Sequence, residues 1–356
     1  MREERNFFIA FFLTLILFFF IILYLNFPLR TQGREFIIYS GEDLKSISQR
    51  LEKEKIISSS ELFIIAARYY KKEPKFQPGI YYFPSDLSLK ALISFLTKEN
   101  HNSFLFTIKE GETLKEIEGE LLEKGILKRT LKDYLLKDFF EADNCLQEYF
   151  KEAENNSLEG FLFPQTYHLP PALKEEETIK IILKNFCQEF LKKDLFKKIV
   201  IFQQEFLDNY PNTRGYSPSF YDILKMASIL EKEVKTREEK RMVADILWRR
   251  LVKGQRLEVD CSICYALFSE FKNCVLKREN YLIDSPFNSY LYQGFPPTPI
   301  SNPSRESIES AVNPLKNEYW FYLSTKEGKI IFSRDYQEHL KNREIYLLDS
   351  KNNETK

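Results

Sequence analysis

Two glutamates separated by one residue are the strongest candidates for catalytic chemistry in this sequence. Glu231 and Glu233 come near the end of residues 217–234, where apolar residues recur at helical spacing. On such a helix the two carboxyl groups fall on opposite borders of the apolar stripe. A carboxyl group that is half removed from water has a raised pKa, which suits a general acid. The same spacing also fits two surface charges on an amphipathic helix, so the pattern alone leaves both interpretations open.

Two helices are predicted around these glutamates. Ser217 and Pro218 have the residue types of an N-cap and a first helical position. A second helix follows, because residues 236–239 have the Thr-x-x-Glu pattern of a capping box and Gly254 has the place of a C-terminal glycine. The result is a helical hairpin with the glutamates near its bend. The residues expected on the solvent side of the first helix are Lys225, Ser228 and Lys232.

A proline-rich segment follows the hairpin. Residues 296–303 contain four prolines in eight positions, and the preceding residues supply asparagine, serine and tyrosine side chains. Prolines stiffen a loop at low entropic cost. A stiff loop with these side chains suits a sugar-binding cleft, although it also fits a passive crossover between two elements.

Five cysteines offer a second kind of chemistry. An odd number is not typical of a disulfide framework. Cys261 and Cys264 have the C-x-x-C spacing and Cys274 follows ten residues later, but no histidine lies nearby in the sequence to complete a zinc site. We therefore expect no metal and no cofactor. In an extracytoplasmic domain, a Cys261–Cys264 or a Cys264–Cys274 disulfide is the alternative.

Composition limits the class of partner. The chain has 356 residues, of which 44% are hydrophobic, so it has enough apolar material for a packed core. Lysine plus arginine and aspartate plus glutamate both number 52, which leaves no net charge. A protein that binds nucleic acid normally shows a basic surplus. The balance therefore argues against a nucleic-acid partner.

The N-terminus predicts a membrane anchor. Residues 7–25 form an uncharged, mostly apolar run of 19 residues, close to the length of a spanning helix. A cleaved signal peptide is the alternative, but no small-residue cleavage site follows the run. The expected organisation is a cytoplasmic leader at 1–6, a transmembrane anchor at 7–25 and a linker at 26–35. Arginines are balanced on the two sides, so the charge rule does not fix the orientation.

An internal repeat appears at an offset of 70 residues. The segment from Phe36 to Ile57 matches the segment from Phe106 to Leu127, and each reads as a strand, a glycine turn and an amphipathic helix. Asp43 and Thr113 could cap these helices, and a second helix is expected near Ser60 and near Thr130. Residues 36–103 and 104–170 therefore form two related α+β units. They resemble LysM-like modules, which bind glycans, but a duplicated scaffold without sugar contacts explains the repeat equally.

Taken together, the motifs resemble one family, the endolytic murein transglycosylases (MltG, or YceG-like). The matching phrases lie at residues 159–167, 227–233, 288–303 and 311–314, and the resemblance runs from about Phe36 to Tyr346. It implies an α+β fold with one N-terminal transmembrane helix, LysM-like α+β modules and a mixed α+β catalytic domain at 171–346. Residues 347–356 would be a polar tail.

The resemblance also implies site residues. The second glutamate of the Glu-Lys-Glu pair is the catalytic residue of the family, here Glu233. The sequence departs from the family at Val259-Asp260-Cys261, where Thr-Asp-Pro is usual, at Tyr265-Ala266 in place of Tyr-Gly, and at Phe287 in place of Tyr. These departures affect the cleft and leave the acid in place. The expected substrate-binding residues are Glu231, Asp260, Ser285, Asn288, Tyr290, Gly294 and Pro297.

The implied activity is cleavage of the β-1,4 bond between N-acetylmuramic acid and N-acetylglucosamine within nascent glycan strands, leaving 1,6-anhydromuramyl ends and terminating polymerisation. The partners would be peptidoglycan strands, peptidoglycan synthases and the bilayer around residues 7–25, with the catalytic domain outside the inner membrane. Two other functions stay open. One is a silent glycan-binding scaffold for synthases, and the other is a hydrolase that uses Asp260 as a second carboxylate.

Overall fold

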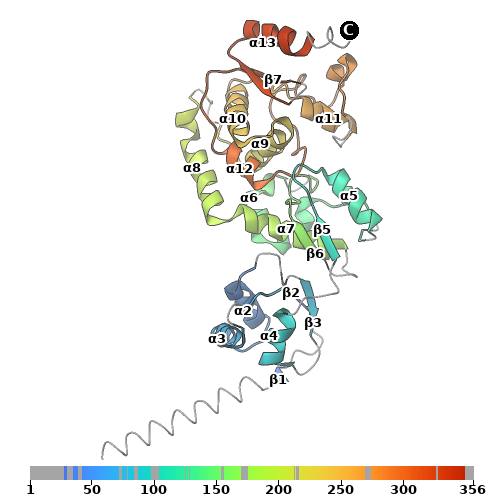
Figure 1. Cartoon of the computed structure of the whole chain (residues 1–356), viewed down its shortest axis with the longest axis vertical. Coiled ribbons are helices and arrows are strands. Elements are labelled where there is room, and N and C mark those ends of the chain that lie inside the picture. Colours follow the sequence, from blue (N-terminus) through green and yellow to red (C-terminus); the bar gives the residue numbers. More distant parts are fainter. Residues whose placement is uncertain are drawn as a thin grey trace, which may run out of the picture. The chain divides into compact units, whose positions relative to one another are not determined.

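The computed structural model describes residues 28–29, 35–38, 42–71, 74–77, 79–83, 87–97, 104–124, 126–127, 129–153, 156–169, 175–211, 213, 216–268, 274–325 and 328–348. Over these residues the fold is mixed α+β, with many helices and small two-stranded sheets (Figure 1). The apolar run at residues 7–25 lies outside the described residues. Within the described part, no helix has the length and apolar character needed to cross a membrane.

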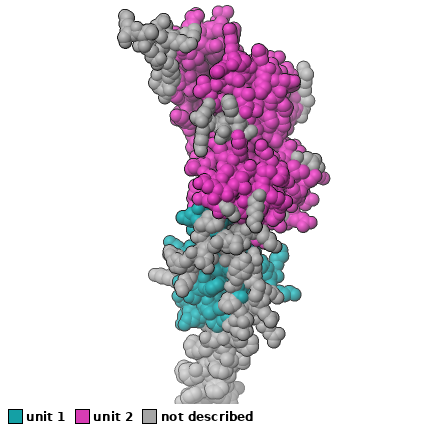
Figure 2. Space-filling model, turned by 90° about the vertical axis from the view of Figure 1, so that its right-hand side faces the viewer, with its two compact units in different colours: residues 1–106, 167–173 teal, residues 107–166, 174–356 magenta. Residues whose placement is uncertain are grey.

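The chain divides into two compact units, residues 1–106 with 167–173, and residues 107–166 with 174–356 (Figure 2). The sequence-based limits differ from this division, because most of the segment at 104–170 groups with the C-terminal residues. In the first unit, two antiparallel strand pairs accompany three helices. These elements are β1 (Pro28–Leu29), β2 (Glu35–Ile38), α2 (Leu44–Lys53), α3 (Ser60–Tyr70), β3 (Gly79–Tyr82), β4 (Leu87–Ser88) and α4 (Leu89–Thr97), with β1 paired to β4 and β2 to β3.

The core of the first unit is built from one face of each element. Ile47 and Leu51 of α2, Phe63 of α3 and Leu92 of α4 are all buried in one apolar cluster with Phe36 of β2. Burying a large apolar side chain stabilises a fold by about 1.5–3 kcal/mol. Because the apolar residues recur at helical spacing, each helix has one apolar face, and these faces pack together to form the core of the unit.

The second unit contains most of the helices. Strand β5 (Phe104–Thr107) pairs with β6 (Thr166–Leu169), and most residues of both strands belong to the first unit. The remaining elements are α5 (Leu114–Glu123), η1 (Leu131–Asp133), η2 (Leu136–Ala142), α6 (Asn144–Tyr149), η3 (Lys151–Ala153), α7 (Glu175–Phe190), α8 (Lys193–Asn209), α9 (Phe220–Glu233), α10 (Arg237–Val252), α11 (Asp260–Phe268), η4 (Arg278–Leu282), α12 (Arg305–Ala311), β7 (Phe321–Ser324), β8 (Ile330–Ser333), α13 (Tyr336–Arg343) and the π-helical turn η5 (Glu344–Leu348).

Helices α9, α10 and α12 pack together in this unit, and α11 packs on α9 (Figure 1). Trp248 of α10 is fully buried, and its indole N–H donates to the backbone carbonyl of Ala311 at 2.9 Å. A buried indole normally needs such a partner. The capping box expected at residues 236–239 is present at the start of α10. These helices form the base on which the residues around Glu233 are held.

The 70-residue repeat is visible in the local structure of both copies. Leu44 is the first residue of α2 and Leu114 is the first residue of α5. Their N-caps, Asp43 and Thr113, have almost the same backbone angles, φ −85° and ψ 163° against φ −84° and ψ 161°. Each cap accepts a backbone N–H three residues later. The predicted strand and first helix are therefore confirmed in both copies, and the glycine turn is confirmed at Gly111, while Gly41 lies outside the described residues.

The second helix of the repeat is present only in the first copy. Helix α3 begins at Ser60 as expected, but Thr130 caps the short 3₁₀ helix η1 instead of an α-helix. The prediction near Thr130 was wrong. Leu131 and Tyr134 are both buried, and a spacing of three matches the period of a 3₁₀ helix. The shared start does not establish LysM-like modules.

Candidate functional site

Glu233 is the last residue of α9, and its carboxyl group contacts two other elements. The backbone N–H of Cys261 in α11 lies 3.3 Å from Oε1, and the hydroxyl of Tyr322 in β7 lies 3.0 Å from Oε2. Burial raises the pKa of this carboxyl group, and the negative charge of Asp260 acts in the same direction. The hydrogen bonds from Cys261 and Tyr322 lower the pKa, but burial prevails. A raised pKa is what a general acid needs.

Helix α9 begins two residues later than the sequence suggested. Its N-cap is Ser219, whose hydroxyl accepts the N–H of Asp222 at 3.0 Å. The carboxylate of Asp222 accepts the N–H of Ser219 at 3.2 Å in return. This capping box outcompetes the expected start at Ser217 and Pro218, because it satisfies two backbone donors at once.

Ser228 was wrongly expected on the solvent side of α9. The residue is fully buried, and its hydroxyl accepts the backbone N–H of Ile300 at 3.1 Å. The hydroxyl of Ser301 donates to the backbone carbonyl of Ser228 at 3.1 Å. The proline-rich loop therefore packs on this face of the helix. Lys225 and Lys232, expected on the same side, are partly buried.

Glu231 has different surroundings from Glu233. Its Oε2 accepts the backbone N–H of Ser304 at 2.8 Å and the Ser304 hydroxyl at 2.5 Å, while Oε1 lies 3.4 Å from the ammonium of Lys240. The two charged side chains are only 9% and 5% exposed. Burial raises the pKa of Glu231, but these hydrogen bonds and the Lys240 charge outweigh it and lower the pKa. Both oxygens contact protein groups and one of them faces a cation, which favours the charged form of Glu231; its contact with substrate stays a prediction.

The two elements that touch Glu233 are tied to α10 by one arginine. Arg250 is buried, and its guanidinium donates to the backbone carbonyls of Leu257 at 2.6 Å and Trp320 at 2.7 Å. Leu257 precedes α11 and Trp320 precedes β7. Hydrogen bonds from a charged donor are stronger than neutral ones. Arg250 thus fixes the approach of Cys261 and Tyr322 to the acid.

Asp260 lies beside the acid and is held by two tyrosines. The hydroxyls of Tyr290 and Tyr281 donate to its Oδ1 at 2.7 and 3.2 Å. The two rings meet edge to face with centroids 4.9 Å apart. Burial, followed by the charge of Asp260, raises the pKa of Tyr281 to about 12 and also raises that of Tyr290. Both hydroxyls therefore stay protonated and can donate at neutral pH. Asp260 is exposed, so a ligand can reach it.

Asn288 organises the loop that carries these tyrosines. The residue is fully buried, and its amide nitrogen donates to the backbone carbonyls of Tyr281 at 3.1 Å and Ile283 at 2.9 Å. Its amide oxygen accepts the N–H of Tyr290 at 3.0 Å. The carbonyl of Ser285 accepts the N–H of Asn288 at 2.8 Å. These contacts give Asn288 and Ser285 a place in the loop framework and direct both tyrosines toward Asp260.

Gly294 and Pro297 lie further along the same loop. Gly294 has φ +88°, a left-handed conformation that favours glycine, and a Cβ added there would meet open space. Pro297 is exposed. Within the described residues, no hydrogen bond links either residue to Glu233. Glycine is thus needed at 294 for the backbone conformation of the turn.

Glu159, the first residue of the phrase at residues 159–167, has a structural place apart from Glu233. Its side chain is 1% exposed, and its carboxyl group accepts the N–H of Leu114 at 3.0 Å and the hydroxyl of Tyr265 at 2.9 Å. The amide of Asn302 donates to it at 3.3 Å. Burial raises the pKa of Glu159 to about 8. Because helix α5, helix α11 and the proline-rich loop all converge on it, the residue is a structural junction.

Sequence reasoning missed three residues of the Glu233 site. Tyr322 and Tyr281 received no role from the sequence, and Cys261 was considered only for metal or disulfide chemistry. Tyr322 is 89 positions from Glu233. No linear spacing signals such a contact. Only the departure at residues 259–261, close to Asp260, could have drawn attention to Cys261.

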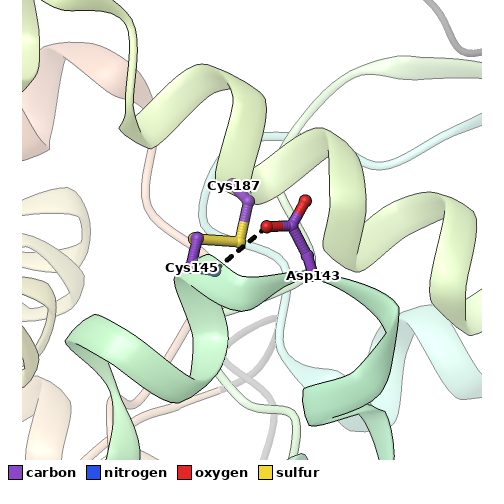
Figure 3. A group of neighbouring side chains, drawn as sticks. All are labelled: Asp143, Cys145 and Cys187. Atoms are coloured by element: carbon purple, nitrogen blue, oxygen red, sulfur yellow. Dashed lines mark hydrogen bonds between the residues drawn. A yellow bond between two sulfur atoms is a disulfide. The ribbon is translucent and has the colours of Figure 1, made fainter. Parts of the chain in front are cut away.

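The cysteines form two disulfides, Cys145–Cys187 and Cys264–Cys274, and Cys261 is free. One of the two disulfides left open by the sequence is therefore present, and the expectation that the odd count excludes a framework was wrong. Asp143 lies close to Cys145 and Cys187 (Figure 3). Its carboxylate caps α6 by accepting the N–H of Cys145 at 3.0 Å. Since the two sulfurs are bonded to each other, this group is a helix cap beside a disulfide and lacks thiolate ligands for a metal.

Similarity to known proteins agrees with this geometry. A protein of Bacillus subtilis (strain 168) named endolytic murein transglycosylase is 30% identical over 329 residues, covering 88% of this chain and 85% of that protein. A protein of the same name from Streptococcus pneumoniae serotype 2 (strain D39) is 24% identical over 345 residues, and the match spans 59% of that longer protein. The crystal structure of a putative yceG-like protein from Listeria monocytogenes matches with a TM-score of 0.54 at 25% identity, covering 87% of this chain and 98% of that one.

The family pattern itself extends over nearly the whole described chain. Residues 36–345 match the YceG-like family, a range that includes both copies of the repeat, the α9–α10 hairpin and the strand that carries Tyr322. The solved structure and the Bacillus subtilis relative cover similar shares of this chain, 87% and 88%. The chain therefore belongs to the YceG-like family.

Proposed function

We propose that this protein is an endolytic peptidoglycan lytic transglycosylase with Glu233 as its only catalytic carboxyl group. The observation that carries the proposal is the contrast within α9. Glu233 has a raised pKa beside an exposed aspartate and two tyrosines, whereas Glu231 is ion-paired to Lys240 with a lowered pKa. The names of the relatives from Bacillus subtilis and Streptococcus pneumoniae support the same activity.

The proposed reaction needs no water. Neutral Glu233 donates its proton to the β-1,4 glycosidic oxygen, the bond between that oxygen and the muramyl anomeric carbon breaks, and an oxocarbenium-like centre forms. The O6 hydroxyl of the same muramyl residue attacks this centre, and the Glu233 carboxylate accepts the hydroxyl proton. One proton leaves and one returns, so the enzyme is regenerated and the product is a 1,6-anhydromuramyl end. The nucleophile is tethered to the substrate, which supplies the proximity advantage.

The surrounding residues have assigned roles in this proposal. Tyr322 holds Oε2 of the acid, and Asp260 offers an exposed carboxylate to the substrate. Its Oδ1 is held by Tyr281 and Tyr290, so Oδ2 is the oxygen that can accept a hydroxyl or acetamido N–H of the glycan. Ser285, Asn288, Gly294 and Pro297 shape the loop behind these groups. Glu231 is a structural residue in place of the substrate contact expected from the sequence.

The cellular setting is part of the proposal. Residues 7–25 anchor the chain in the inner membrane and the catalytic residues lie outside the cytoplasm, where nascent glycan strands are made. Cleavage within a strand at this place would terminate its polymerisation, next to peptidoglycan synthases. The zero net charge of the chain fits an uncharged polysaccharide backbone better than a polyanion.

Mass spectrometry of digested glycan strands tests the proposal. Anhydromuramyl ends are expected from the full-length protein and not from Glu233→Gln. Reducing ends would favour a hydrolase in which Asp260 activates water, since its charge already acts on Glu233. Uncleaved strands that nevertheless co-sediment with the protein would favour the scaffold.

A further inference from the structure

Cys261 contacts Glu233 through its backbone. Its N–H lies 3.3 Å from Oε1 of Glu233, and both this N–H and the polar side chain of Cys261 act to lower the pKa of the carboxyl group. The residue is 5% exposed and is a free thiol. The other four cysteines are joined in disulfides. Cys261 is thus kept reduced and buried beside the candidate acid.

The two donors to Glu233 differ in what they can do. A backbone N–H only donates, so Oε1 always faces a donor. A tyrosine hydroxyl donates or accepts, so Oε2 faces a group that can turn and accept a proton from it. A proton on Oε1 would make this oxygen a donor that faces the N–H of Cys261, and two donors that face each other repel. The neutral acid is therefore best accommodated with its proton on Oε2.

We propose that Cys261 is a positioning residue, whose backbone N–H holds Oε1 of Glu233 as an acceptor and so leaves the transferable proton on Oε2, beside Tyr322. This inference rests on the proposed role of Glu233 as the acid. It adds which oxygen acts and which residue decides it.

Other titratable groups around the carboxyl group are unchanged by substitution at 261. Asp260 is the neighbour on α11, Tyr281 and Tyr290 face Asp260 and Glu233 from η4 and the loop, and Tyr322 faces the acid from β7. Two cations complete the surroundings, Lys232 of α9 near Cys261 and Arg250 of α10 near Tyr322. A shift in the pH–rate profile of a Cys261 variant therefore reflects the loss of contacts made by residue 261 itself.

Three substitutions at residue 261 distinguish the contribution of the thiol from that of the backbone N–H. Cys261→Ser keeps the N–H and a hydroxyl donor, Cys261→Ala keeps only the N–H, and Cys261→Pro removes both donors. A proline at the second residue of α11 is compatible with the first turn of a helix. The matched control is the double variant Cys145→Ala with Cys187→Ala, which removes sulfur atoms from the same unit at a distance from the acid.

The experiment is the pH–rate profile of glycan cleavage by the full-length chain in detergent. Loss of a donor to the carboxylate raises the pKa of Glu233, so the alkaline limb should move to higher pH in Cys261→Ala and further in Cys261→Pro. Cys261→Pro should also lower kcat roughly threefold to tenfold, with little change in KM, because a hydrogen bond to a charged group is lost. Cys261→Ser and the control should keep the wild-type limb.

A Cys261→Pro profile that superimposes on that of Cys261→Ala, in protein with an unchanged melting temperature, would overturn the inference, because these two variants differ in the N–H. If Cys261→Pro does not fold, Tyr322→Phe decides, since it removes the group that faces the proton on Oε2, and an unchanged pH–rate profile in that variant would overturn the inference. Retained activity of Glu233→Gln would instead overturn the proposed function, so the two failures are distinct.

Discussion

Glu231 and Glu233 are two residues apart on one helix, yet their surroundings shift their pKa values in opposite directions. Glu231 receives two hydrogen bonds from Ser304 and faces the ammonium of Lys240, so its charged form is favoured. Glu233 is partly buried against α11 and β7 with the negative charge of Asp260 nearby, so its neutral form is favoured. Position on the helix determines which neighbours a carboxyl group meets, and the neighbours determine whether it holds the structure or can give up a proton.

The largest expected effect is on catalytic activity, which should differ strongly between the Glu233→Gln and Glu231→Gln variants. Glu233→Gln keeps the size and the hydrogen-bonding capacity of the side chain but has no proton to donate at neutral pH. Cleavage of glycan strands should fall by about 100-fold or more. Glu231→Gln should retain most of the wild-type kcat in its folded fraction, measured by release of soluble muropeptides. Equal losses of kcat in the two variants would contradict the different roles assigned to Glu231 and Glu233.

The next largest effect is on stability, which should fall in Glu231→Gln but not in Glu233→Gln. Glu231→Gln leaves Lys240 with Glu306 as its remaining partner at 3.3 Å and removes a buried charge pair. The free energy of unfolding should fall by about 2 kcal/mol, as measured by chemical denaturation at pH 7. Glu233→Gln should change it little or raise it, because a buried carboxylate without a cationic partner is replaced by a neutral amide. A larger loss in Glu233→Gln than in Glu231→Gln would contradict the assigned roles.

Tyr322→Phe should have a smaller effect, confined to the Glu233 side of the comparison. The variant loses the hydroxyl that donates to Oε2 at 3.0 Å, which raises the pKa of the acid further. The alkaline limb of the pH–rate profile should move to higher pH, and kcat should fall roughly tenfold. Tyr319→Phe is the matched control, since Tyr319 precedes the same strand and packs on Phe332. A shift of the limb in the control as well would point to a general disturbance of β7.

The pH dependence of stability gives the smallest difference, and its sign is opposite for the two residues. Glu231 has a lowered folded pKa, so its contribution is present above the unfolded value of about 4.3 and is lost as pH falls through the folded pKa. Glu233 has a raised folded pKa, so its contribution is present below that unfolded value and is lost as pH rises through the folded pKa.

Melting temperatures measured from pH 2 to pH 8 should show both signs. Relative to the wild type, Glu231→Gln should lose stability as pH rises to the unfolded value of about 4.3 and stay level above it, whereas Glu233→Gln should gain stability as pH rises above that value. Slopes of the same sign in the two variants would mean that the two carboxyl groups share one electrostatic environment.

Local patterns predicted the elements of this fold better than they predicted its site. The α9–α10 hairpin, the capping box at Thr236 and the start of α2 and α5 depend on neighbouring residues, and all were visible in the sequence. The burial of Ser228 and the 3₁₀ helix after Thr130 depend on packing by distant segments, so the sequence predicted them wrongly.

In the site, too, features that depend on neighbouring residues were predicted and contacts between distant segments were not. Helical spacing placed Glu231 and Glu233 on different borders of α9, and the structure brings them to different partners. The choice between them came from family resemblance, because no local pattern distinguishes an ion-paired glutamate from a neutral one. Tyr322 and Cys261 could not be linked to Glu233 before the chain was folded, since the contacts join segments 89 and 28 residues apart.

Cleavage of glycan strands in heavy-oxygen water tests the central claim most directly, that Glu233 acts alone and that the substrate's own hydroxyl is the nucleophile. The wild type should release muramyl ends lighter by one water than reducing ends and free of heavy oxygen, Glu231→Gln should give the same ends, and Glu233→Gln should release almost none. Heavy oxygen incorporated into new reducing ends by the wild type would contradict the account and show that a second group, with Asp260 the nearest candidate, activates water.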